Sequence, residues 1–133
     1  MEKYYTITLK PDMTAVVHTH KTLDLELPFL QEQVGGYIEV VSAGLARNSS
    51  MASLRMIINE DGKYLNLPVN VLGTVLYDAP CDVIVGNVLI CSTYNPDPDA
   101  EPDTYALCQS QYDVVMKWIS SLVEKSHITE VAV

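Results

Sequence analysis

The sequence predicts a single α+β domain. We expect a mixed, mainly antiparallel sheet of about five or six strands, with about three helices largely on one face. Short segments rich in β-branched and aromatic residues alternate in polarity, as half-buried strands do. Segments that open with proline and carry apolar residues at helical spacing separate these strands. The 133 residues, 48% of them hydrophobic, suffice for one core and show no second composition regime.

The chain begins with a predicted hairpin. Residues 4–10 and 15–19 are predicted strands, and Pro11 with Asp12 forms the turn between them. Beyond the hairpin turn, His18 and His20 lie on one face of the second strand, a spacing that can hold zinc. No third ligand is close in sequence. We therefore favour solvated histidines on an edge strand over a metal site.

A helix is predicted from Pro28 to the glycine pair Gly35-Gly36. Proline suits a first helical turn, and glycine tolerates the left-handed conformation that ends a helix. A strand at 37–41 follows directly. Residues 43–52 lack any periodicity and are expected to form a surface loop.

The middle of the chain contains a second hairpin signal and a second helix. Asp61-Gly62 follows an apolar strand, which is typical of a hairpin turn, and Pro68 opens a helix that runs through Leu76. Gly86 interrupts the apolar run that comes next. The predicted strands of this region are 54–58, a short return at 63–65, 82–85 and 87–92.

The C-terminal part contains one segment of low complexity. Residues 95–103 hold three prolines and four acids and are expected to form an exposed loop. Thr104 is placed to cap a helix over about 104–125, and the tail 128–133 is predicted to add an edge strand. The predicted core contains Ile7, Leu30, Val34, Ile38, Val40, Met56, Ile58, Leu72, Val75, Val88, Ile90, Val115, Trp118, Ile119 and Leu122.

The charge balance argues against nucleic acid as a partner. The net charge is −9, and the only arginines are Arg47 and Arg55. Binding to phosphates requires clustered cations, and the same shortage weakens attraction to an anionic membrane. The N-terminus lacks a signal peptide, and three cysteines without close pairing favour a reducing compartment. We therefore expect a cytoplasmic protein with neither nucleic-acid nor membrane partners.

Three stretches carry a family resemblance. They are Leu30–Glu39 (LQEQVGGYIE), then Asn59–Lys63 (NEDGK) with Leu67–Asn70 (LPVN), and Asp82–Leu89 (DVIVGNVL). Their order and spacing resemble the domain of unknown function 3846, a family of small proteins from phages, plasmids and their bacterial hosts. The resemblance covers about residues 3–92. It implies an origin in a mobile element and supplies no activity.

No catalytic constellation is defined by the sequence, so an enzyme is less expected than a binding protein, and no cofactor or metal is predicted. The leading hypothesis is an accessory protein of a phage or mobile element that binds a host protein. The alternative is a small-molecule binder that sequesters a nucleotide-like ligand. The oligomeric state is left open. The candidate ligand-binding residues are Gly35, Gly36, Tyr37, Arg47, Arg55, Asn59 and Asn70.

Overall fold

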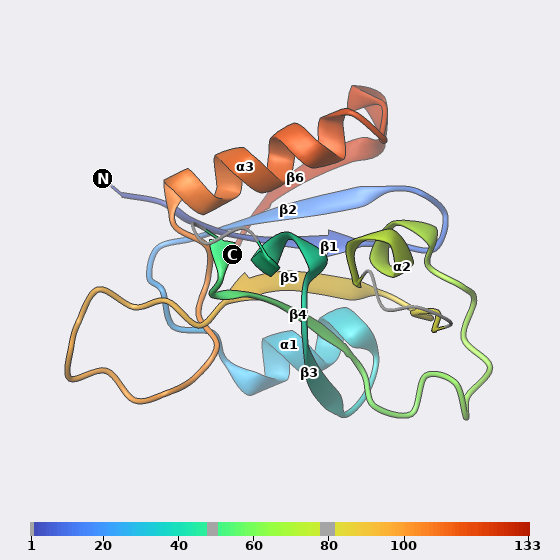
Figure 1. The fold of residues 1–133 in the computed structure, drawn as a ribbon, viewed down its shortest axis with the longest axis horizontal. Helices are drawn as coiled ribbons and strands as arrows, with labels where there is room; N and C mark the ends of the chain where they lie inside the picture. Colours follow the sequence, from blue (N-terminus) through green and yellow to red (C-terminus); the bar gives the residue numbers. More distant parts are fainter. Residues whose placement is uncertain (1, 48–50, 78–81) are drawn as a thin grey trace.

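The computed structural model describes residues 2–47, 51–77 and 82–133 and confirms the α+β class (Figure 1). One mixed sheet has the strand order β3-β4-β5-β1-β2-β6. Neighbouring strands are antiparallel, except that β6 runs parallel to β2. The strands are β1 (Tyr4–Leu9), β2 (Ala15–His20), β3 (Ile38–Ser42), β4 (Leu54–Asn59), β5 (Val88–Ser92) and β6 (Ile128–Ala132). The helices are α1 (Leu27–Val34), α2 (Val71–Tyr77) and α3 (Gln109–Ser120), with short 3₁₀ helices η1 (Gly44–Arg47) and η3 (Lys125–His127).

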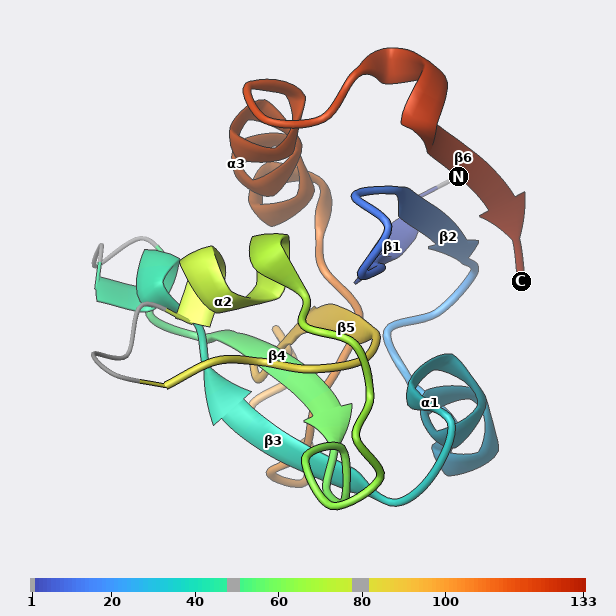
Figure 2. The same cartoon turned by 90° about the vertical axis from the view of Figure 1, so that its right-hand side faces the viewer.

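Helices cover both faces of the sheet (Figure 2). α2 and α3 lie on one face, where residues such as Leu72 and Ile119 join the main core. α1 lies on the opposite face, and its Leu30 and Val34 pack against Ile57 and other apolar side chains of β4 and β5. Two of the three helices therefore share a face, as expected, and the third covers the other face.

The position of β5 explains why both faces need a cover. All five of its residues are buried, because β5 lies between β4 and β1 in the middle of the sheet. Val88 and Ile90 point into the main core, and Leu89 and Cys91 point towards α1. A continuous apolar run is the pattern of a strand that is buried on both sides.

Local signals place the ends of α1 correctly, but α3 is shorter than predicted. Gly35 has φ +78°, and its N–H donates to the Gln31 carbonyl at 2.8 Å. α3 begins after Cys108 instead of Thr104. Bridges from Tyr105 to Ser92 and from Leu107 to Tyr5 hold that backbone extended beside the sheet, so it cannot be helical.

Three further expectations are wrong. Residues 63–65 belong to a turn, and Val85 makes only an isolated bridge to Val69 in place of a strand at 82–85. The segment 43–52 is not simply a surface loop, because Ala43 and Met51 are buried in the main core. Residues 48–50 of that segment lie outside the described part of the chain.

The predicted core is largely confirmed. Three of its members, Val40, Val75 and Leu122, are instead about half exposed (45%, 55% and 47%). Val40 lies on an edge strand, Val75 on the outer side of α2, and Leu122 beyond the end of α3. Residues 95–103 contain no regular secondary structure and are mostly exposed, as expected for the acidic loop.

The two histidines are not on an edge strand. β2 lies between β1 and β6, and His20 is buried, with its Nε2 2.8 Å from the Thr6 hydroxyl. The rings of His18 and His20 both meet Phe29 of α1 edge-on, with centroids 5.2 Å apart. Burial, helped by the neighbouring His18, lowers the pKa of His20 from 6.5 to about 4.

We predict that His20 makes the fold sensitive to acid. Between pH 6.5 and about 4 the unfolded chain binds a proton at His20 that the folded chain excludes. The contribution of His20 to the free energy of unfolding therefore falls by about 3 kcal/mol as the pH is lowered through this window, and this contribution changes no further below it. Urea unfolding of the wild type and of His20→Gln across this window measures the effect.

The glutamine variant should be less sensitive to acid, because an amide does not titrate in this range. His127→Gln is the matched control, because it makes the same substitution at an exposed position in η3. If His20→Gln and His127→Gln have the same effect on the pH profile, His20 is not the acid-sensitive group.

Candidate functional site

Two of the candidate ligand-binding residues meet where α1 turns into β3. The Asn59 side chain is buried; its Nδ2 donates to the Val34 carbonyl at 3.0 Å, and its Oδ1 accepts the Asp61 N–H at 2.8 Å. A Cβ added at Gly36 would lie 3.0 Å from that Nδ2, which explains why glycine fits there. Asn59 therefore ties the end of α1 to the turn after β4, and its amide is occupied by the backbone.

Tyr37 is the exposed member of this group. It is 68% exposed and lines a shallow pocket of about 340 Å³ together with Gly36, Asn59 and Leu65. Gly35 is adjacent in sequence but does not line it. The structure thus brings Gly36, Tyr37 and Asn59 together at one surface, while the polar atoms of Asn59 face inward.

Asn70 has a structural role instead of a place at that surface. It is completely buried, and its Nδ2 donates to the carbonyls of Leu9 and Gly86 at 2.9 and 2.8 Å. Its Oδ1 accepts the Gly73 N–H at 2.8 Å. Both N–H groups of the Asn70 amide are therefore used, and its oxygen already accepts one hydrogen bond. Asn70 joins α2 to the sheet and has no free donor for a ligand.

Arg55, the one arginine whose side chain the structure describes, lies away from these residues. Arg55 is half-buried on β4, and its Nη1 donates to the carbonyls of Ala52 and Leu54 at 2.9 and 2.8 Å. Arg55 lines none of the described pockets. The side chain of Arg47 lies outside the described residues. The structure therefore does not unite an arginine with Tyr37.

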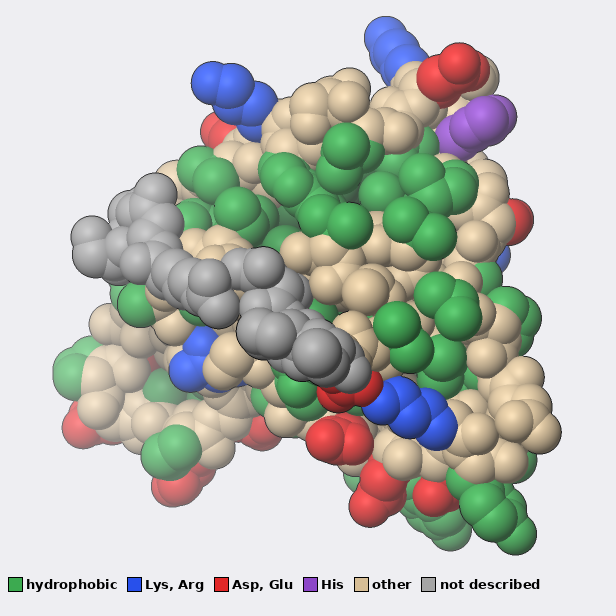
Figure 3. Space-filling view, turned by 45° about the vertical axis from the view of Figure 1, so that its right-hand side comes forward, with side chains coloured by type: hydrophobic (Ala, Val, Ile, Leu, Met, Phe, Trp, Pro, Cys, Tyr) green, Lys and Arg blue, Asp and Glu red, His purple; other side chains and the backbone are tan. Residues whose placement is uncertain are grey.

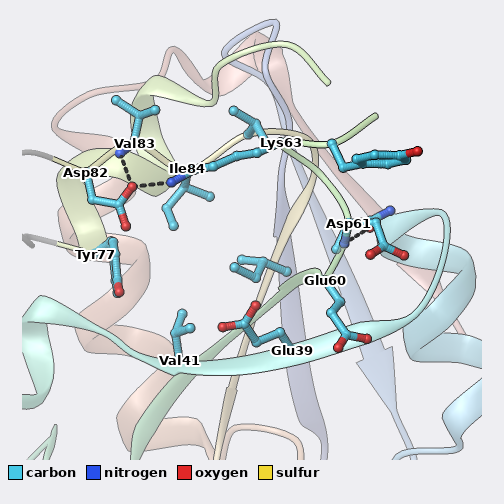
Figure 4. Close-up of a pocket in the computed structure, with 13 residues that line it drawn as sticks. Glu39, Val41, Glu60, Asp61, Lys63, Tyr77, Asp82, Val83 and Ile84 are labelled. Carbon is cyan, nitrogen blue, oxygen red and sulfur yellow. Dashed lines mark hydrogen bonds and ion pairs between the residues drawn. The ribbon is translucent and has the colours of Figure 1, made fainter. Parts of the chain in front are cut away.

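A deeper hollow lies over β3 and β4, on the face that carries α2. We call it the acidic pocket (Figure 4). Its volume is about 360 Å³. The side chains of Glu39 and Val41 on β3 point into it (Figure 4). Apolar side chains from several elements, including Ile58 and Tyr77, line one part of it. Its charged residues are Glu39, Glu60, Asp61, Lys63 and Asp82.

Negative charge predominates in the acidic pocket. Lys63 forms an ion pair with Asp82, and this contact, with the Val83 N–H, holds the pKa of Asp82 below its usual value. The carboxylates of Glu39, Glu60 and Asp61 remain in excess of the single lysine. Such a surface attracts cations and repels phosphate. Across the described residues, no three His, Cys, Asp or Glu side chains are placed to hold a metal ion.

A second hollow lies on the other face of β3. We call it the apolar pocket; its volume is about 530 Å³. Ile38 and Val40 of β3 line it together with leucines that precede or belong to α1. Asp103 and Thr104 lie at one side. β3 therefore separates an acidic hollow from an apolar one.

Sequence reasoning missed most of the acidic pocket. Glu60 and Asp61 are adjacent carboxylates in a predicted turn, where exposure to solvent is enough to account for them. Lys63, Tyr77 and Asp82 are not predicted as binding residues, because they come from three separate segments that meet only after folding. The one available hint was Glu39, a charge within an otherwise apolar strand.

The family of the chain follows from comparison with known proteins. The family model of the domain of unknown function 3846 (DUF3846) matches residues 5–118, so the chain belongs to this family. The match extends beyond the resemblance over 3–92 and includes the acidic loop and most of α3. No curated protein and no solved structure matches the chain. None of the described helices is long and apolar enough to cross a membrane.

We predict that Asn70→Ala lowers the free energy of unfolding by about 3 kcal/mol, because two buried carbonyls and one buried N–H lose their partner. Urea unfolding measures the change. Asn95→Ala is the control, since the Asn95 side chain caps only an exposed turn at Asp97 and should cost less than about 1 kcal/mol. Equal stability of Asn70→Ala and wild type would contradict the structural role.

Proposed function

We propose that this chain is a non-enzymatic accessory protein of a phage or other mobile element, which acts in the cytoplasm by binding a host protein. The observation that carries the proposal is the acidic pocket, where exposed carboxylates surround apolar side chains beside an edge strand. Protein interfaces combine apolar contact area with charges that select the partner. The family resemblance supports the mobile-element origin.

The surface around the acidic pocket suits a protein partner better than a small ligand. Figure 3 shows a broad area of hydrophobic side chains over α2 and α3, with acidic side chains gathered below it. Val71 and Val75 of α2 and Val83 beside the pocket are each between 43% and 55% exposed. Exposed apolar side chains next to charged ones are typical of surfaces that become buried in complexes. The net charge of −9 favours a basic partner.

A pull-down from bacterial lysate tests this proposal. We predict that the tagged full-length chain recovers a partner at low salt and that the triple variant Glu39→Gln, Glu60→Gln, Asp61→Asn does not. The physical reason is that neutral amides keep the shape of the pocket and remove its attraction for cations. Recovery should also fall as salt rises, because exposed charges are screened within about 10 Å at 0.1 M salt.

The matched control removes the same charge elsewhere. The triple variant Asp97→Asn, Asp99→Asn, Glu101→Gln removes the same amount of negative charge from the exposed acidic loop and should recover the partner as the wild type does. A partner lost equally from both variants would show that only total charge matters. If no partner is recovered by the wild type at micromolar protein, the proposal fails.

The alternative, a nucleotide-like ligand, has less support. Tyr64 and Tyr77 with Lys63 line the acidic pocket, but Lys63 is already paired with Asp82 and carboxylates surround it. We therefore predict that nucleotides at millimolar concentration do not raise the melting temperature. A ligand present at 100 times its dissociation constant would stabilise the fold by about 2.7 kcal/mol. A rise of several degrees that Lys63→Gln abolishes would favour the alternative.

A further inference from the structure

β3 has a free edge whose backbone groups are oriented outward. The Glu60 N–H donates to the Tyr37 carbonyl at 2.9 Å. This bond lies one residue beyond the first pair of β3 and β4, Ile38 with Asn59, so it continues the same register. Because hydrogen-bonded pairs in an antiparallel ladder recur every second residue, Glu39 also bonds β4. Ile38 and Val40 therefore direct their N–H and C=O groups away from β4. Within the described chain, no strand pairs with that side.

The two faces of β3 present different chemistry to a strand added at this edge. Glu39 and Val41 face the acidic pocket, and Ile38 and Val40 face the apolar pocket. Side chains directly opposite each other on paired strands lie about 5 Å apart. Every second side chain of an added strand would therefore lie on the face of the acidic pocket, and the intervening ones on the face of the apolar pocket.

Charge complementarity decides between a second copy and a different partner. In an antiparallel pairing of two β3 strands, matching faces would place the two Glu39 side chains directly opposite or diagonal to each other. That repulsion opposes a dimer through β3. A lysine or arginine at the same position would instead lie beside Glu39 and the carboxylates of Glu60 and Asp61.

The other edge of the sheet lacks these features. β6 is also unpaired on its outer side among the described residues, and four of its five residues are exposed. None of the described pockets is lined by β6. An edge strand with a hollow on each face can select side chains as well as backbone, whereas β6 can select backbone alone.

We propose that the free edge of β3 binds an extended segment of a partner protein as an added strand, with Lys or Arg side chains over the acidic pocket and apolar side chains over the apolar pocket. This inference rests on the proposed function and names the chemistry of the partner. Main-chain hydrogen bonds to Ile38 and Val40 hold the segment, and the two pockets require strict alternation of basic and apolar residues.

The test uses two labelled peptides of about eight residues with the same composition. One alternates lysine with valine, and the other carries the lysines and the valines in two blocks. The full-length chain should bind the alternating peptide at least about tenfold more tightly by fluorescence anisotropy, because only alternation satisfies both faces of β3. Equal binding of the two peptides would show that only their charge matters. It would overturn the proposal that the peptide binds as an added strand.

Methylation of the peptide backbone tests the hydrogen bonds without changing the protein. An added strand uses the N–H groups of alternate residues, so methylating one alternate set should abolish binding and methylating the other should not. The sensitive set is the valines for an antiparallel strand and the lysines for a parallel one. Equal tolerance of both sets would overturn the proposal.

Protein variants locate the peptide. Val40→Pro removes an N–H that β4 does not use and should abolish binding, with circular dichroism confirming the fold. Glu39→Lys should weaken binding by about tenfold or more, and Glu130→Lys on the β6 edge is the control with the same charge change. If Glu39→Lys and Glu130→Lys weaken binding equally, the peptide does not bind at β3.

The outcomes separate the two proposals. If the pull-down partner depends on the acidic pocket while the peptides show no dependence on alternation or Val40, strand addition is wrong and the proposed function remains. If neither a partner nor a peptide binds, both proposals fail.

Discussion

The pairing of β1 with β5 at the centre of the sheet is the constraint on which the rest of the structure depends. Because every residue of β5 is buried, the sheet must be covered on both faces. α2 and α3 provide the cover on one side, and α1 provides it on the other. Asn70 strengthens the arrangement, since one amide binds the carbonyls of Leu9 in β1 and Gly86 just before β5.

The face under α1 is less apolar than the main core, and this shapes its chemistry. Thr6 and Thr8 of β1 are completely buried there, and each has a side-chain partner, His20 and Gln33 respectively. Buried polar groups are tolerated when their hydrogen bonds are satisfied. Phe29 contacts both histidine rings edge-on, and the burial of His20, followed by the effect of His18, is what lowers the pKa of His20.

β3 carries exposed side chains and, within the part of the chain that the structure describes, unpaired backbone groups that do not contribute to the core. Its side chains Glu39 and Val40 are exposed, and its outer backbone groups pair with nothing among the described residues. A charge that points to one side of an edge strand is a recognised defence against self-association. The same charge opposes a second acidic strand and favours a basic one, so in the proposed complex a single glutamate would both limit self-pairing and select the partner.

The sequence by itself determined the elements whose signals are local. Short runs of β-branched and other apolar residues located the strands β1 to β5, and Gly35 ended α1, because these patterns depend on residues a few positions apart. Tertiary structure decided how the elements meet: the parallel pairing of β6, the shortening of α3 by bridges at Tyr105 and Leu107, and the cover of both sheet faces. Tertiary structure also placed Asn59 and Asn70 at different sites and brought together the residues that line the acidic pocket. Such contacts join residues distant in sequence, and their energies exist only once the chain has folded.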